Sequence, residues 1–211
     1  MSLVTLSAAY GAGGSRVGPA VAERLGVTFV DRAIPTAVAE RLAIPLEEAL
    51  AHDQSMGGAL ERLLATLAPA GQAYGAVPVD VLAERDYRRV TEEVLLEHAA
   101  DGRAVLLGRA AAIVLRDDPR ALHVRLDGPR RRRIAQAMAV QGVDRDTAER
   151  RLEETDRARE AYVRHFYRCD PKDAGLYHLV IDSTAIPLDA CVEIIALAAR
   201  ARGERAAIDG A

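Results

Sequence analysis

Short apolar runs along the chain alternate with longer stretches in which apolar residues recur at helical spacing. The runs predict five buried strands, at residues 3–7, 27–30, 104–107, 122–126 and 179–182. The longer stretches predict helices at residues 16–25, 79–100, 129–141, 144–167 and 188–202. Strands that alternate with helices in this way favour an α/β fold, built on a doubly wound five-stranded parallel sheet.

The pattern shows no repeat, linker or low-complexity tract that would divide the chain. Residues 1–203 are therefore expected to form one domain, and residues 204–211 a flexible tail. Residues 34–100 interrupt the regular alternation, because Pro35 and Pro45 are placed to open short helices in this segment. We expect a helical insertion there, between the second and third strands.

A glycine-rich segment fills the turn from the first strand to the first helix. Compared with the phosphate-binding pattern G-x-x-x-x-G-K-[ST], Gly13 and Ser15 match, whereas Ala8 and Gly14 replace the first glycine and the lysine. Backbone N–H groups at a helix N-terminus bind anions whatever the side chains are. We therefore expect phosphate to be bound by Gly11, Ala12, Gly13, Gly14, Ser15 and Arg16. The Ser15 hydroxyl would hold Mg²⁺. The alternative to a phosphate-binding loop is a glycine-rich turn that only caps the helix.

Arginine dominates the basic residues of the chain. Of the 28 basic residues, Lys172 alone is a lysine, so cationic chemistry elsewhere falls to planar guanidinium groups that suit bidentate phosphate contacts. Arg16 or the arginines between residues 130 and 159 could replace the charge of the missing loop lysine. Asp156 and Arg159 are three residues apart and share a helix face. A solvated helix laced with salt bridges is the alternative for this segment.

Overall charge and apolar content narrow the expected partners. The net charge of −3 gives no general reason to expect nucleic-acid binding. No apolar run reaches the roughly 18–20 residues that a membrane span needs, and the N-terminus has no export signal. A cytoplasmic protein that binds neither nucleic acid nor membrane is expected, as a monomer or a homodimer.

Taken together, the motifs resemble those of the cytidylate kinase-like family, relatives of bacterial cytidylate kinase. The resemblance rests on the order and spacing of several segments, namely residues 7–14, 29–32, 105–111, 123–126, 156–159, 162–167 and 177–184. It covers most of the chain. It implies a fold of the P-loop nucleotide kinase type, in which residues 34–100 bind the acceptor and residues 129–167 form a helical lid.

The resemblance also implies an activity, namely transfer of the γ-phosphoryl group of Mg-ATP to a nucleoside monophosphate, with CMP or dCMP favoured. ATP and a small phosphorylated acceptor would be the partners. Carried over residue by residue, the acceptor would be bound by Asp31, Arg32, Arg109, Asp156 and Arg159. The expected catalytic residues are Arg109 and Arg159 from this resemblance and Arg16, the arginine that follows the loop.

Three departures from the family pattern leave other functions open. Ala110 stands where cytidylate kinases have an acceptor-binding aspartate, and Leu152 where they have an arginine. Gly14 stands where the loop lysine is expected, a lysine that the cytidylate kinase-like family also tends to lack. A nucleotide-binding protein without turnover is one alternative, because fold does not fix function. A kinase for a different small-molecule acceptor is the other.

Overall fold

The computed structural model describes residues 2–31, 79–108 and 110–209, without the side chains of residues 79–87 and 209. The expected insertion up to residue 78, together with Arg32 and Arg109, lies outside the described residues. Five strands form one parallel sheet in the order β2-β3-β1-β4-β5. They are β1 (Leu3–Ala8), β2 (Thr28–Val30), β3 (Ala104–Leu107), β4 (Ala121–Asp127) and β5 (Leu179–Asp182). The predicted α/β fold with a five-stranded parallel sheet is confirmed.

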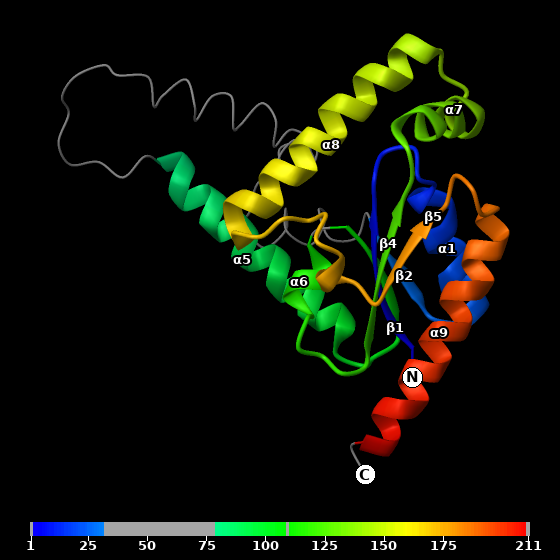
Figure 1. Cartoon of the computed structure of the whole chain (residues 1–211). Helices are drawn as coiled ribbons and strands as arrows, with labels where there is room; N and C mark the ends of the chain where they lie inside the picture. The colour runs from blue at the N-terminus through cyan, green and yellow to red at the C-terminus, as the bar shows by residue number, and fades with distance from the viewer. Residues whose placement is uncertain (1, 32–78, 109, 210–211) are drawn as a thin grey trace.

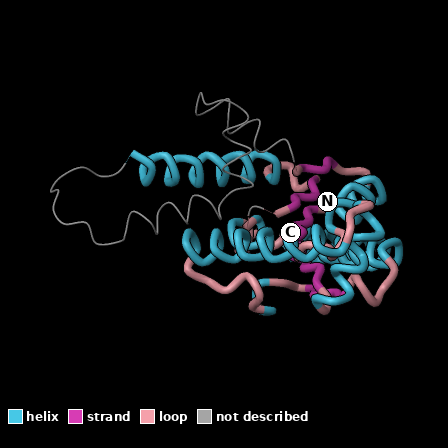
Figure 2. Tube along the Cα trace, turned by 90° about the horizontal axis from the view of Figure 1, so that it is seen from above, coloured by secondary structure: helices cyan, strands magenta, loops and turns pink. Residues whose placement is uncertain are grey.

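Helices cover both faces of this sheet (Figures 1 and 2). Helices α1 (Gly14–Leu25) and α9 (Leu188–Asp209) pack on one face, and α5 (Val79–Ala99) and the short α6 (Ala111–Val114) on the other. Side chains alternate along β1 accordingly, because Leu3 joins the core beneath α5 and α6 whereas Val4 and Leu6 join the core beneath α1 and α9. The central strands of the sheet are thus buried on both sides, as in most parallel sheets.

Strands β1 and β3 are neighbours whose chains leave for opposite faces. Leu6 of β1 is in register with Leu107 of β3, and the Gly108 amide donates to the Leu6 carbonyl at 2.9 Å. The chain then enters α1 on one face after β1, and α6 on the other face after β3. Open α/β sheets bind ligands outside the carboxyl ends of the strands at such a divergence. The glycine-rich loop after β1 therefore occupies the expected binding edge.

A helical hairpin stands above this edge (Figure 1). It consists of α7 (Arg130–Gln141), which follows β4, and α8 (Arg145–Tyr167), whose N-terminus is capped by the Asp144 carboxylate accepting from the Thr147 amide. Ile134 and Ala137 of α7 pack against Ala148 and Leu152 of α8 in a small core of their own. This separate core places the two helices as a unit over the loop.

Two details of the helices differ from the sequence-based expectations. Helix α9 continues to Asp209, past residue 202 where the sequence pattern ended the last helix. Gly203 does not end the helix, since it is buried and is followed by residues with good helix propensity. Helix α1 begins at Gly14 rather than at Arg16, so two residues of the glycine-rich segment belong to its first turn. Among the described residues, no helix combines the length and apolar character needed to cross a membrane.

Candidate phosphate-binding site

The loop after β1 has the backbone geometry of an anion-binding turn. Gly11 and Gly13 have φ values of 77° and 80°, which favour glycine, and Gly13 is the N-cap of α1. The Gly13 carbonyl accepts from the amides of Arg16 and Val17 at 3.0 and 2.9 Å. Within the described part of the chain, no acceptor meets the amides of Gly13, Gly14 and Ser15. These amides and the positive end of the α1 dipole suit a phosphate group.

The glycines of this loop are also required by their surroundings. A Cβ atom on Gly11 would collide with the backbone carbonyl of Arg133 in α7, and one on Gly13 would lie 2.7 Å from a methyl group of Leu188. Gly14 is buried against Ala8 and the side chain of Leu107. The loop is therefore packed closely between α7, α9 and the sheet, and it has no room for side chains at these three positions.

Helix α7 contributes two hydrogen bonds to the loop carbonyls. Arg133 is buried, and its guanidinium donates through Nη1 to the Tyr10 carbonyl and through Nε to the Gly128 carbonyl, both at 2.9 Å. One turn later, Nε2 of Gln136 donates to the Gly11 carbonyl at 3.0 Å. Both side chains thus bind backbone atoms, so their contacts fix the path of the loop.

Helix α8 also reaches the loop. Oδ1 of Asp156 accepts from the Tyr10 amide at 2.9 Å, and its Oδ2 accepts from Nη1 of Arg133 at 2.7 Å. Nη1 of Arg159 donates to the Ala8 carbonyl at 2.6 Å. The two residues that were expected to share one face of this helix do so, and that face is turned toward the loop.

The turn after β5 meets the loop from the other side. The Ser183 hydroxyl donates to the Ala12 carbonyl at 2.7 Å. Its neighbour Asp182 accepts a hydrogen bond from the Thr184 hydroxyl at 2.6 Å, and this bond, with Arg132 nearby, holds the pKa of Asp182 below its usual range. Asp182 is therefore an anion at neutral pH, and its ion pair with Arg132 at 2.9 Å joins this turn to α7.

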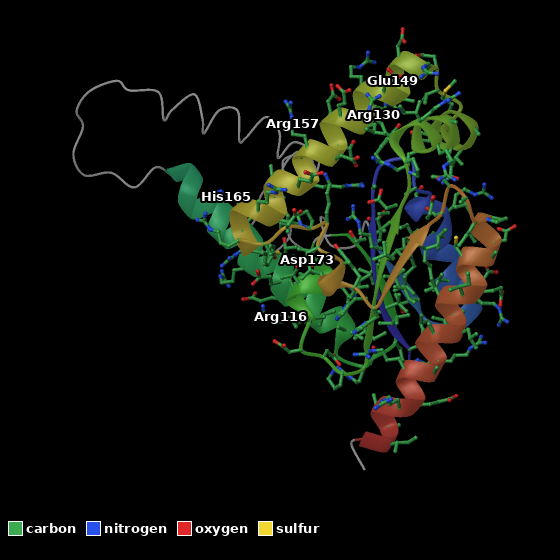
Figure 3. All side chains as sticks on the ribbon, viewed as in Figure 1. Arg116, Arg130, Glu149, Arg157, His165 and Asp173 are labelled. Atoms are coloured by element: carbon green, nitrogen blue, oxygen red, sulfur yellow. The ribbon has the colours of Figure 1, made fainter. Side chains whose placement is uncertain are left out.

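Several arginines on α1 and on the helical hairpin form no ion pair with residues that the structure describes. Within the described segments, Arg16, Arg131 and Arg157 are exposed and form no ion pair. In contrast, Arg130 is paired with Glu153 of α8 at 2.6 Å. Figure 3 labels Arg130 and Arg157, which lie on the hairpin above the sheet. Positive charge is thus available on both α1 and the hairpin, in a region where the loop itself has no lysine.

The structure brings together one group of the predicted site residues. Gly11 to Arg16 form the loop and the first turn of α1, and Asp156 and Arg159 contact that loop. Asp31 follows β2, which is separated from β1 by β3. Arg32 and Arg109 lie outside the described residues, so their roles stay predictions, as does the acceptor role of Asp156 and Arg159.

Sequence reasoning missed the residues that hold the loop from α7. Arg133 belongs to the run of four arginines that opens α7, and no motif distinguishes it from Arg130 or Arg132. Helical spacing carried the only usable signal, because the residue next to it, Ile134, and Ala137 are apolar and face the core.

A parallel sheet of this strand order, with a glycine-rich loop between β1 and α1, defines an α/β protein of the P-loop kinase fold. The model of the cytidylate kinase-like family matches residues 3–185 of the chain. The chain therefore belongs to the cytidylate kinase-like family.

Solved structures share this fold at low sequence identity. An uncharacterized protein from Eubacterium ventriosum has a TM-score of 0.62 at 16% identity, with 92% of this chain and 96% of that chain covered. A gluconokinase from Sinorhizobium meliloti has a TM-score of 0.51 at 19% identity, with 100% and 98% covered. A shikimate kinase from Bacteroides thetaiotaomicron has a TM-score of 0.50 at 16% identity, with 92% and 95% covered. A search of curated proteins finds no match.

Proposed function

We propose that this protein is an ATP-dependent phosphotransferase that moves the γ-phosphoryl group of Mg-ATP to a nucleoside monophosphate, with CMP or dCMP favoured. Membership of the cytidylate kinase-like family supports the reaction and the class of acceptor. The preference for cytosine rests on the family resemblance alone. Ala110 stands where cytidylate kinases have an acceptor-binding aspartate, and this departure weakens the carry-over of pyrimidine preference more than it weakens the assignment of the fold.

The single observation that carries the proposal is the set of amides at the start of α1 that meet no acceptor among the described residues. Gly13, Gly14 and Ser15 present their N–H groups at the carboxyl end of β1, where the loops after β1 and β3 diverge. A polyphosphate bound there would complete the hydrogen bonding of these amides and would sit at the positive end of the helix dipole.

The acceptor is itself an anionic phosphate, so the reaction needs no general base to activate it. Catalysis would come from holding donor and acceptor in line and from neutralising the charge of the transferring group. Arg16 and Arg159, with Arg109 by resemblance, would supply positive charge in place of the missing lysine. We assign the acceptor contacts to Asp31, Arg32, Arg109 and Arg159, also by resemblance.

Mg²⁺ would accompany ATP, and the residues present fit that arrangement. The Ser15 side chain is exposed in the first turn of α1, beside the unpaired amides. In the described part of the chain, no group of three His, Cys, Asp or Glu side chains could hold a metal ion. Mg²⁺ commonly takes most of its ligands from water and substrate phosphates, so a single hydroxyl from the protein is consistent with this chemistry.

Two alternatives follow from specific observations. Gly14 in the lysine position favours a protein that binds a nucleotide without transferring phosphate. The solved structures with this fold include proteins named gluconokinase and shikimate kinase, which favours a small-molecule acceptor other than a nucleotide. Each alternative differs from the proposal in one measurable quantity, namely turnover in the first case and acceptor identity in the second.

The test is ADP release from Mg-ATP, measured with each ribo- and deoxyribonucleoside monophosphate and with shikimate and gluconate. The proposal predicts turnover that depends on a nucleoside monophosphate and falls at least about tenfold in Arg109→Ala. Arg116→Ala serves as the matched control, because Arg116 is exposed and paired with its neighbour Asp117. Turnover with shikimate or gluconate alone, or nucleotide-dependent thermal stabilisation without any turnover, would replace the proposal with one of its alternatives.

A further inference from the structure

The geometry points to Asp156 as a positioning residue of the phosphate-binding loop, which fixes the Tyr10 peptide from α8 and thereby sets the affinity for the donor phosphates. The inference rests on the proposed function, since it concerns the same loop. It assigns Asp156 to the donor side of the site, whereas the family resemblance would assign it to the acceptor.

The loop depends on other elements for its conformation, because it has few side chains of its own. Residues 8–14 are alanine and glycine apart from Tyr10, and two of the glycines adopt positive φ. Glycine leaves the backbone many alternative conformations, so a defined loop needs external contacts. Side chains from other elements supply these contacts by donating hydrogen bonds to loop carbonyls. In chain order, the carbonyls of Ala8, Tyr10, Gly11 and Ala12 accept from Arg159, Arg133, Gln136 and Ser183.

Asp156 differs from those four residues in what it binds. It accepts a hydrogen bond from a loop amide, the Tyr10 N–H, and it also binds the guanidinium that holds the Tyr10 carbonyl. Asp156 and Arg133 therefore bind the amide and the carbonyl of the same residue, Tyr10. Tyr10 directly precedes Gly11, so these two hydrogen bonds fix the backbone that leads to the amides at the start of α1.

The two hydrogen bonds to the Asp156 carboxylate are stronger than bonds between neutral groups, because they involve charged side chains. Arg133 is only 11% exposed and Asp156 only 20% exposed at their side chains, and both bonds to the carboxylate are short. Asp127 lies 3.6 Å from the same guanidinium, but its carboxylate is also paired with Arg125 at 2.6 Å, so it compensates the charge of Arg133 only in part. Hydrogen bonds to charged groups contribute more than neutral ones, and removing one partner leaves the other unsatisfied.

The two roles for Asp156 predict different kinetic effects. If Asp156 positions the loop, its loss weakens binding of ATP and of free polyphosphate and leaves the Michaelis constant of the acceptor unchanged. If it contacts the acceptor, its loss raises the acceptor's Michaelis constant and leaves polyphosphate binding unchanged. Inorganic tripolyphosphate has neither base nor ribose, so it reports on the loop alone.

Three variants separate the contributions. Asp156→Ala removes both bonds, Asp156→Asn keeps an oxygen that can accept from the Tyr10 amide, and Glu153→Ala is the control. Glu153 is an exposed carboxylate one turn earlier on α8, paired with exposed Arg130. Calorimetric titration with tripolyphosphate in Mg²⁺ buffer and amide hydrogen exchange at Tyr10 are the readouts, with thermal melting as the check on folding.

We expect Asp156→Ala to bind tripolyphosphate about tenfold more weakly and to lose protection at the Tyr10 amide. Asp156→Asn should recover only part of both, because it keeps an acceptor for the Tyr10 amide but turns an NH2 group toward the Arg133 guanidinium. Glu153→Ala should match the parent protein. Unchanged tripolyphosphate affinity in folded Asp156→Ala would overturn the inference, as would a parent protein that binds no tripolyphosphate. A parent protein that binds tripolyphosphate but turns over no acceptor contradicts the proposed function alone, and the binding comparison still decides the role of Asp156.

Discussion

A Cβ atom on Gly14 would lie 2.5 Å from the Cβ of Ala8, closer than two carbon atoms of this kind can approach. These are the two positions at which the loop departs from the usual phosphate-binding pattern, where Ala8 replaces a glycine and Gly14 replaces the lysine. The methyl group of Ala8 thus occupies the space that a lysine at position 14 would need. The two departures are therefore coupled, because with alanine at position 8 the loop has no room for the Cβ of a lysine at position 14.

This relationship predicts how the loop responds when a lysine is introduced. Gly14→Lys alone should lower the free energy of unfolding by about 1–3 kcal/mol, because the added Cβ overpacks a buried position. Ala8→Gly should relieve the clash, so that the double variant is more stable than the sum of the two single changes predicts. Equilibrium unfolding in denaturant measures all four proteins of this cycle. Strictly additive effects would show that Ala8 and Gly14 are independent.

A second prediction concerns the contact between the loop and α7. Gly11→Ala should destabilise the protein by roughly 3 kcal/mol or more, because the new methyl group meets both a positive φ and the carbonyl of Arg133. Gly142 is the matched control, since its φ is 67° and no atom lies within 4 Å of a Cβ placed there. Gly142→Ala should cost about 1 kcal/mol. Equal losses in thermal or denaturant unfolding would mean that backbone strain alone explains both.

A third prediction concerns pH and the stacked pair of His123 and His178, whose rings are 4.9 Å apart. Burial, with the charges of His178 and Arg202, lowers the pKa of His123 from 6.5 to about 4. His123 is therefore protonated below about pH 6.5 in the unfolded chain, but only below about pH 4 in the folded protein. Stability is fully present above pH 6.5 and falls as the pH is lowered toward 4, by about 3 kcal/mol in all.

The His123→Gln variant tests this assignment, because glutamine can keep a hydrogen bond with Thr5 but cannot titrate. Denaturant unfolding between pH 7 and pH 4.5 should show a flatter stability profile in this variant than in the parent protein. Burial also lowers the pKa of His178, so a smaller slope of the same sign should remain. A profile identical to that of the parent protein would assign the pH dependence to other groups.

A fourth prediction concerns the source of positive charge at the loop. Arg16→Ala should lower kcat/KM for ATP by about tenfold or more, because an exposed guanidinium beside unpaired amides stabilises charge on the transferring phosphate. Arg24→Ala is the control on the same helix, since Arg24 is exposed and pairs with Glu193. An effect of equal size in both variants would indicate damage to α1 and would remove Arg16 from the mechanism.

The sequence predicted the sheet more accurately than it predicted the site. The predicted strands at residues 104–107 and 179–182 coincide with β3 and β5. For β3 the cause is burial, because buried parallel strands read as continuous apolar runs, whereas β5 is an edge strand with a short apolar run of its own. The loop was also predictable, since glycines between a strand and a helix have a local physical cause. In both cases the information lies within a few neighbouring residues.

The remainder of the site depends on contacts between distant residues. Arg133 meets Tyr10 across 123 positions, and Asp156 meets it across 146. Such partners are set by how α7 and α8 pack over the sheet, which no local pattern records. The sequence pattern also ended the last helix at residue 202, whereas α9 continues past the buried Gly203 to Asp209.

The most direct test of the account is to follow the labelled γ-phosphate of ATP in the presence of Mg²⁺ and each nucleoside monophosphate. The proposed function predicts that label appears in a nucleoside diphosphate, with CDP or dCDP formed fastest, and that Arg109→Ala suppresses this product. Label that remains in ATP with every nucleoside monophosphate, in a protein shown to bind ATP, would contradict the account.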